Sequence, residues 1–426
     1  MRWVPAISGR RLPADLIEDH HTTAMAPSTL VGPNTSPGTM DRAVMGDCRR
    51  WNTAAATMKS LPRKLQRNSS QPGVTYPEKP PLQGLDLTRI STTMKVVTRG
   101  QRVAAKLLKL TKMTDVEERE ELMASCAKEF LKEMDAKLEG LPQEAVDCIS
   151  IASMMHRIGM VMKFIHPKDW LFQGHAKVPI SLIEMFDQRF QYAEAHHMAS
   201  VLWGMGQLGR RSLDLPLGEG TARNLIDRIV QTVPNKSDGM KGNSVCHFVE
   251  GLSLLYDKAP PGCLETLLGK TAPRLEEEHT LTMNIARLLY GLAELNYEDK
   301  IGVVEVGVKQ LAFHFAHLGD NHISDAVWAL GKLKSPHASR FMLHVQAKAE
   351  QEGFGLSKSR MSPRQLIRFV WGMDQLNYKT AAMGIIKKLC PEVNYRRREF
   401  TNEQIQEFTD ICGNMGMNVG HLIEEC

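Results

Sequence analysis

Features that mark several common classes of protein are missing from this sequence. No stretch of its 426 residues approaches the roughly 18 to 20 consecutive apolar residues of a membrane-spanning helix, so we expect no insertion into a membrane. None of the eight cysteines belongs to a C-x-x-C pair, which argues against a zinc finger. Several cysteines occupy apolar helical positions, and this placement predicts buried free thiols rather than disulfides. Strand patterns are nearly absent, which indicates an all-α protein.

Motifs of enzymes and cofactor sites are missing as well. Residues 204–209 spell G-x-G-x-x-G, but dinucleotide binding requires a strand before the glycines, and the segment before them has a helical pattern. Residues 262–271 resemble a phosphate-binding loop, yet six residues separate the glycines where four are required. His314 and His317 have no acidic or cysteine partner nearby in the sequence, so we expect no metal site. We therefore predict a protein that is not an enzyme and binds no cofactor.

Charge is distributed unevenly along the chain. Residues 1–114 carry 18 Lys and Arg against 7 Asp and Glu, a net charge of +11. Residues 115–426 carry 35 against 41, a net charge of −6. A basic arm suits a nucleic acid, an acidic partner or a targeting machinery, whereas the body is mildly acidic.

The N-terminal region divides into two predicted parts. Residues 1–81 are rich in Pro, Gly, Ser and Thr without a lasting apolar period, which predicts a disordered arm. Residues 48–77 contain six basic residues and no acidic one, a composition typical of an organellar transit peptide, although a solvated tail is the alternative. Three acidic residues near the N-terminus leave open an atypical presequence or a start at a later methionine. Residues 82–140 are expected to form a basic amphipathic helix, for RNA, a partner or an anionic membrane, followed by a connecting helix.

One phrase recurs through the rest of the chain. It occupies residues 201–209, 288–296, 326–334 and 369–377, with weaker copies elsewhere. The centres of the copies lie 38 to 50 residues apart, in the range of helical-pair solenoids. The seven centres are Met154, Gly204, Gly251, Gly291, Ala329, Gly372 and Ile411.

The columns of this repeat predict a helix in each copy. Positions −6, −3, +1 and +4 from the centre are apolar and fall on one helical stripe, so each copy predicts an amphipathic helix of 12 to 14 residues. A second apolar segment follows most copies, which indicates helix pairs. Gly or Asn often stands at position +5, where a left-handed conformation ends helices, namely at Gly159, Gly209, Asn296, Asn377 and Gly416. Residues 141–426 are therefore predicted to form an α-solenoid of about seven degenerate helix pairs of roughly 40 residues each.

A polar stripe accompanies the apolar one. At positions −7, −4 and +3, only Leu254 among 21 residues is apolar, and the centre between these positions is usually Gly or Ala. The small central residues would let a partner approach the helices closely. The polar residues, which vary from copy to copy, could then recognise the partner one repeat at a time. The alternative is that this stripe is the solvent face of the helix. Trp203, Trp328 and Trp371 adjoin the apolar stripe and are expected to pack, with stacking on nucleic-acid bases as the alternative.

The recurring phrase resembles the octotricopeptide repeat and its relatives, the heptatricopeptide and FAST-kinase-like helical repeats. The resemblance rests on Trp-Gly/Ala-Leu/Met-x-x-Leu, as in residues 202–209 and 327–333, and covers about residues 141–416. It implies an α-solenoid that acts mainly in mitochondria or plastids and binds RNA for its processing, stability, translation or ribosome assembly.

Two hypotheses of function follow. In the first, an RNA-binding solenoid of mitochondria, or alternatively of plastids, contacts RNA through the polar stripe while the basic arm adds phosphate affinity. In the second, a structural subunit docks proteins of an organellar ribosome or another large ribonucleoprotein. The residues that the first hypothesis places on RNA are Arg157, His197, Gln207, Asn284, Arg287, His322, Lys332, Gln365, Arg368, Gln375, Gln404 and Asn414.

Overall fold

The computed structural model describes residues 116–138, 146–162, 177–208, 220–277, 280–351 and 361–420. Throughout these ranges the chain forms α-helices and short 3-10 helices with no strand, which confirms the all-α prediction. None of the helices in these ranges has the length and apolarity needed to cross a membrane. The predicted arm (residues 1–81) and the first part of the region predicted to form the basic amphipathic helix (residues 82–115) lie outside the described residues.

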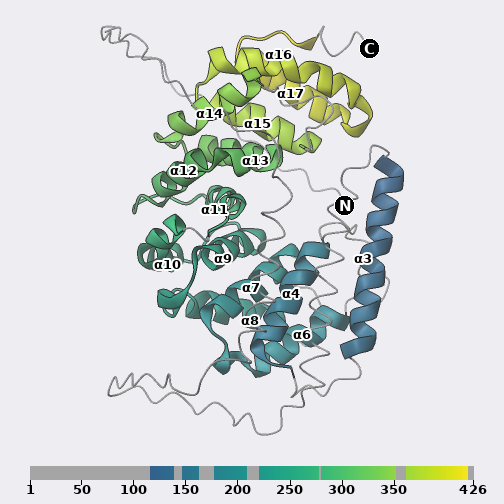
Figure 1. Ribbon diagram of the computed structural model, residues 1–426, viewed down its shortest axis with the longest axis vertical. Coiled ribbons are helices and arrows are strands. Elements are labelled where there is room, and N and C mark those ends of the chain that lie inside the picture. Colours follow the sequence, from purple (N-terminus) through teal and green to yellow (C-terminus); the bar gives the residue numbers. More distant parts are fainter. Residues whose placement is uncertain are drawn as a thin grey trace, which may run out of the picture. The chain divides into compact units, whose positions relative to one another are not determined.

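The centre of every copy of the repeat lies on an α-helix, and we call these helices the A row. Successive A helices pack against one another, as Figure 1 shows for the stack from teal to yellow. From α7 onward they are 13 or 14 residues long, in agreement with the predicted 12 to 14. The A row consists of α4 (Cys148–Met162), α7 (Ala195–Gln207), α9 (Gly242–Leu255), α11 (Thr282–Glu294), α13 (Asp320–Lys332), α15 (Pro363–Gln375) and α17 (Asn402–Asn414).

The second apolar segments form another set of helices, the B row. Each B helix packs against the A helix that precedes it in the chain, as predicted for helix pairs. In Figure 1, α10, α12 and α14 lie on the left of the A helices. The B row consists of α6 (Lys177–Gln188), α8 (Thr221–Thr232), α10 (Cys263–Thr271), α12 (Val303–Phe313), α14 (Ala338–Gln351) and α16 (Lys379–Tyr395). Short 3-10 helices follow five of them, at Phe190–Tyr192, Ser237–Gly239, Ala272–Glu276, Phe315–His317 and Arg397–Glu399.

The core lies between the two rows and is built by the apolar columns. At position −3 every side chain is fully buried, from Ile151 through Phe248 to Phe408. Position +1 is fully buried as well, from Met155 to Cys412. Each large side chain removed from water in this way contributes about 1.5–3 kcal/mol, so these columns hold each A helix against its neighbours in both rows. The six cysteines in the described ranges are buried and free, as expected.

Helix α3 (Val116–Leu138) precedes the repeats. It packs on α4 and α6 and buries Phe130, Leu131 and Met134. It therefore lies against the first helix of each row, within the part of the chain for which a connecting helix was expected.

The ends of the A helices follow the predicted left-handed residues with one exception. Asn296, Asn377 and Gly416 have φ angles of 51°, 58° and 83°, which confirms these stops. Lys334 takes the same conformation at φ 49°, although neither Gly nor Asn stands there. The prediction for Gly159 is wrong, because α4 continues through it to Met162. A Cβ at Gly159 would lie 3.0 Å from a ring carbon of Trp203, so this glycine serves helix packing. Gly209 lies outside the described residues.

Candidate partner-binding face on the A row

The small central residues of the repeat serve contacts between A helices. A Cβ at Gly204 would lie 2.6 Å from the carbonyl oxygen of Met155, and one at Gly372 would lie 2.6 Å from that of Val327. At Gly251 the nearest atom would be the backbone nitrogen of Trp203, at 2.8 Å. These approaches are closer than any side chain permits. The neighbouring A helix, and not a partner, therefore occupies the space that the small residues leave, which corrects our interpretation of this column.

The polar column at position −7 lies at the first turn of the A helices. His197, Gln365 and Gln404 are the third residues of α7, α15 and α17, and each completes a reciprocal capping box with the residue before the helix. Asn284 donates from Nδ2 to Oδ1 of Asn243 at 2.9 Å. His197 and Asn284 are buried, whereas His322, at the same position of α13, is half-buried. Helix capping gives this column a structural role, independent of any ligand.

A first cluster on the A-row face, the histidine cluster, consists of His156, Trp203 and His247. The His156 ring of α4 stacks on Trp203 of α7, with ring centroids 4.5 Å apart. It also lies 4.9 Å from the His247 ring of α9, although α7 separates their helices. Trp203 donates from Nε1 to Glu250 at 2.7 Å, and Gln207 donates to the other oxygen of Glu250 at 3.3 Å.

The two imidazoles of the histidine cluster are uncharged at neutral pH. Burial, as the largest cause, and the charges of Arg287 and Arg157 together lower the pKa of His247 to about 4. The pKa of His156 is held well below its usual value by burial, by His247 and by the same two arginines. Arg157 on α4 and Arg287 on α11 therefore flank the cluster from opposite sides, and both are half-buried.

A second cluster, the tyrosine cluster, consists of Tyr290, Glu294, Trp328, Lys332 and Arg368. Arg368 of α15 donates to the Tyr290 hydroxyl at 2.5 Å and to Glu294 at 3.3 Å, both on α11. Its guanidinium passes over the Trp328 ring of the intervening α13, 4.8 Å from the centroid. Lys332 lies 3.5 Å from Glu294 and 5.0 Å from the Trp328 centroid. Burial raises the pKa of Tyr290 to about 12, so its hydroxyl stays protonated and donates to Glu294 at 2.6 Å.

Asp325 lies beside the tyrosine cluster on α13. Burial raises the pKa of its carboxyl group to about 6, while a hydrogen bond from Gln365 and the charges of Arg368 and Arg287 act in the opposite direction. The Gln365 amide donates to Asp325 at 3.4 Å. This carboxyl group therefore titrates close to neutral pH within a surface that also holds guanidinium groups.

Both clusters join next-but-one A helices across the helix between them. Side chains of α4 and α9 meet over α7, and side chains of α11 and α15 meet over α13. An inward curve brings side chains of alternate helices together, and in Figure 1 the A row forms an arc whose ends, at α4 and α17, lie to the right of α9 and α11, away from the B helices. We therefore call this face of the A row concave. Aligned along it are Arg157, Arg287, Lys332 and Arg368, together with the acidic residues Glu250, Glu294 and Asp325.

The structure places most of the predicted contact residues in internal interactions. Of the twelve, only Gln375 and Asn414 are fully exposed, and Gln375 donates to the neighbouring Asp374 at 3.3 Å. The prediction did not include the column at position −1, which supplies Trp203, Glu250, Tyr290, Trp328 and Trp371 to the same face. The signal was present in the sequence, because positions −4, −1 and +3 form one helical stripe. Trp203 and Trp328 are 4% and 8% exposed, in agreement with packing as their first role.

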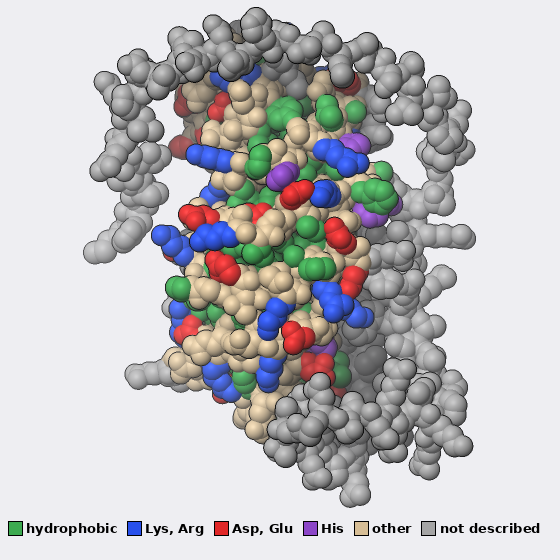
Figure 2. Space-filling view, turned by 90° about the vertical axis from the view of Figure 1, so that its left-hand side faces the viewer, with side chains coloured by type: hydrophobic (Ala, Val, Ile, Leu, Met, Phe, Trp, Pro, Cys, Tyr) green, Lys and Arg blue, Asp and Glu red, His purple; other side chains and the backbone are tan. Residues whose placement is uncertain are grey.

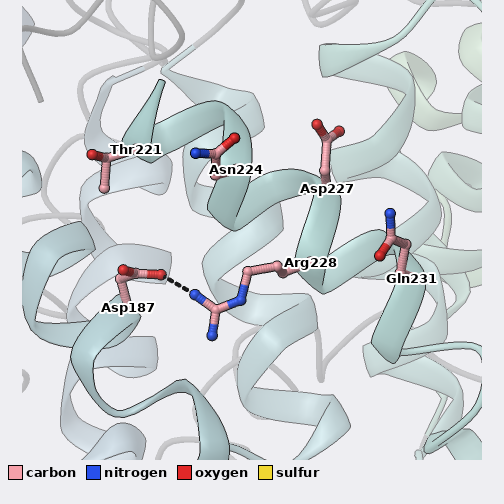
Figure 3. Close-up of a pocket in the computed structure, with 6 residues that line it drawn as sticks. All are labelled: Asp187, Thr221, Asn224, Asp227, Arg228 and Gln231. Atoms are coloured by element: carbon pink, nitrogen blue, oxygen red, sulfur yellow. Dashed lines mark hydrogen bonds and ion pairs between the residues drawn. The ribbon is translucent and has the colours of Figure 1, made fainter. Parts of the chain in front are cut away.

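The B row presents a different surface. Figure 2 shows basic and acidic side chains interspersed with hydrophobic ones on the side where α10, α12 and α14 lie. Phe313 and Leu343 are the most exposed apolar residues on these helices, at 76% and 64%. Six residues of α6 and α8 line a shallow polar pocket in which Arg228 and Asp187 form an ion pair at 2.5 Å (Figure 3).

Whether either surface could hold a bound ion depends on its possible metal ligands and on the charges of the pocket. The described residues contain no group of three or more His, Cys, Asp or Glu side chains that is arranged to hold an ion. The charged side chains that line the pocket already interact with other residues of the protein. The guanidinium of Arg228 lies over the Phe190 ring at 4.1 Å, and Asp227 accepts a hydrogen bond from Tyr256 at 2.6 Å. The chain matches no protein-family model and no curated protein sequence. The fold and the concave face of the A row therefore carry the functional argument.

Proposed function

We propose that this protein is a non-enzymatic RNA-binding α-solenoid of about seven degenerate helix pairs. RNA lies along the concave A-row face, and the basic N-terminal arm adds sequence-independent affinity for phosphates. In keeping with the resemblance to organellar helical repeats, the protein acts in mitochondria or plastids. There it serves RNA processing, stability, translation or ribosome assembly.

The alignment of cations on the concave face carries this proposal. Arg157, Arg287, Lys332 and Arg368 stand on α4, α11, α13 and α15, at positions −4 and +3 of the repeat, which share one helical stripe. A row of cations on a continuous curved surface matches the repeated phosphates of a nucleic-acid strand. The acidic residues between them prevent a uniformly positive groove, so the face favours contacts at defined positions over a purely electrostatic association.

RNA crosslinking and sequencing in isolated organelles tests the proposal. The variant replaces Arg287, Lys332 and Gln375 with Ala, which leaves the Arg368 hydrogen bonds intact. Its matched control replaces Lys270, Lys309 and Arg340 with Ala, all exposed on B helices. Discrete RNA sites that persist in the control and disappear in the variant would support RNA binding by the A row. An absence of crosslinks in the wild-type protein, or crosslinks unchanged in the variant, would overturn the proposal.

Docking of proteins is the second candidate function, because Phe313 and Leu343 expose large apolar side chains on the B row. In that case the solenoid is a structural subunit of an organellar ribosome or ribonucleoprotein. Purification of the tagged protein after nuclease treatment distinguishes the two. A stoichiometric protein complex that survives nuclease and is lost on replacing Phe313 and Leu343 with Ser would favour docking.

A further inference from the structure

Three polar side chains of the concave face have nitrogen atoms without a partner among the residues that the structure describes. His156 on α4, His247 on α9 and Arg287 on α11 make no hydrogen bond or ion pair with any described residue. All three are half-buried, and none of their nitrogen atoms is among the fully buried unpaired atoms of the described chain. Because these nitrogen atoms are unpaired within the described chain and are not fully buried, their N–H groups remain accessible to a ligand.

The other charged side chains of this face differ from Arg287 in having partners. In the tyrosine cluster, Arg368 bonds to Tyr290 and Glu294, and Lys332 pairs with Glu294. The carboxylate nearest the histidine cluster, Glu250, already accepts hydrogen bonds from Trp203 and Gln207. The guanidinium of Arg287 thus lies beside two imidazoles with no carboxylate of the described residues in ion-pair contact.

The three side chains also converge on one place. The imidazole rings lie 4.9 Å apart, and both contact the ring of Trp203 on α7, with ring centroids 4.5 Å and 5.5 Å away. Arg287 occupies the same repeat column as His247, at position −4 of the next A helix, so the two are neighbours across the α9–α11 contact. The charge of Arg287 acts on both imidazoles, and so does that of Arg157.

We propose that His156, His247 and Arg287, with Arg157 beside them, bind one phosphate group of the RNA. The inference rests on the RNA-binding function proposed above and identifies one subsite within it. A guanidinium offers its fork of N–H donors to two phosphate oxygens, and each neutral imidazole offers one further N–H. A phosphate would satisfy these donors and balance the charge of Arg287.

Occupation of this subsite is linked to proton uptake. The charged groups around the imidazole pair are Arg157 from α4, Glu250 from α9 and Arg287 from α11, with Asp325 of α13 beside Arg287. The arginines and burial keep the imidazoles neutral in the free protein. A bound phosphate carries the opposite charge and favours the imidazolium form, so binding of an RNA strand strengthens as the pH falls.

The first test uses inorganic phosphate on the full-length chain. Carbon-13 labelling of histidine allows the imidazole resonances to be followed, and His156→Gln and His247→Gln variants assign them. Both resonances are expected to move with phosphate at constant ionic strength, and to move much less in Arg287→Gln. Arg340→Gln, an exposed arginine of α14, is the matched control. Resonances that stay in place, or that move as far with chloride or acetate, would overturn the subsite.

The second test measures the affinity for a 5′-labelled single-stranded RNA. Arg287→Gln is expected to weaken binding about tenfold and to reduce the salt dependence by about one phosphate contact, whereas Arg340→Gln changes neither. His247→Gln is expected to abolish the strengthening at low pH. Thermal unfolding of each variant confirms that it is folded.

Together, the two tests distinguish failure of the subsite from failure of the RNA-binding proposal. Strong RNA binding that is indifferent to Arg287 and His247 overturns the subsite and leaves the RNA-binding proposal standing. Phosphate-dependent shifts without RNA binding leave a phosphate site at these residues standing, but overturn RNA as its ligand and the RNA-binding proposal with it.

Discussion

Arg368 on α15 donates a hydrogen bond to the hydroxyl of Tyr290 on α11, 78 residues away in the chain and two A helices away in the array. The guanidinium also bonds to Glu294 and lies over the Trp328 ring. This single side chain therefore connects three helices, and its interactions cannot be reproduced by a residue that contacts only the adjacent helix.

Replacing Arg368 with Ala is expected to lower the free energy of unfolding by about 2–3 kcal/mol, because Tyr290 and Glu294 lose a charge-assisted partner in a half-buried setting. Arg364→Ala removes an exposed arginine from the same helix and is expected to change stability by less than about 0.5 kcal/mol. Urea unfolding of both variants measures the difference. Equal midpoints would mean that the Arg368 contacts add nothing to stability.

The glycine contacts between A helices give a paired prediction. A Cβ at Gly372 would lie 2.6 Å from the Val327 carbonyl oxygen, so Gly372→Ala is expected to cost about 1–3 kcal/mol as α13 and α15 are forced apart. A Cβ at Gly384, inside α16, would meet nothing within 4 Å. Gly384→Ala is therefore expected to stabilise the protein by about 0.5–1 kcal/mol through the higher helix propensity of alanine. Thermal unfolding should shift in opposite directions for the two variants, and a common sign would contradict this packing.

Asp325 gives a prediction on pH. Burial raises its pKa from 3.8 to about 6, so in that interval the folded protein holds a proton that the unfolded chain has released. Stability contributed by this group is therefore present below pH 4, is lost as the pH rises towards 6, and stays lost above it. The loss amounts to at most about 3 kcal/mol. Asp325→Asn is expected to remove this slope and to unfold at a higher urea concentration than the wild type at pH 7. Parallel pH profiles for the two proteins would show that Asp325 titrates normally.

The capping boxes predict the effect of single hydroxyl groups. The Ser362 and Thr401 side chains accept hydrogen bonds from the backbone nitrogen atoms of Gln365 and Gln404 at 3.3 Å and 3.2 Å. Ser362→Ala and Thr401→Ala are each expected to cost about 1 kcal/mol. Amide hydrogen exchange in the first turns of α15 and α17 should accelerate in the respective variant and stay unchanged in the other. Exchange that is unaffected in both would contradict a capping role.

The helices could be predicted from the sequence because burial on one stripe imposes a period on the apolar residues. Positions −3 and +1, from Ile151 to Cys412, were assigned to the core from spacing alone, and all of them are buried. The spacing of the apolar residues does not show whether a small residue faces a neighbouring helix or a binding partner. Gly204 and Gly372 occupy the boundary between the apolar and polar stripes, where a partner or the next helix could equally stand.

The candidate site was predictable in part for a similar reason. A polar side chain in the first turn of a helix can cap the helix or bind a ligand. The residue types at His197 and Gln404 suit both roles, so the sequence alone does not distinguish them. Meetings across an intervening helix, such as His156 with His247, depend on the curvature of the array. Curvature results from the sum of many contacts, among them the backbone approaches at Gly251 and Gly291, and no local pattern records it.

The bridges over α7 and α13 have a mechanical consequence. Arrays in which each unit touches only its neighbours bend and unravel almost freely from one end. Here the bridging side chains lie on the concave side, so flattening the curve pulls them apart, while tightening it does not. The array is therefore stiffer against opening than against closing. A partner seated on the concave face that draws the array tighter would meet less elastic resistance than one that requires it to straighten.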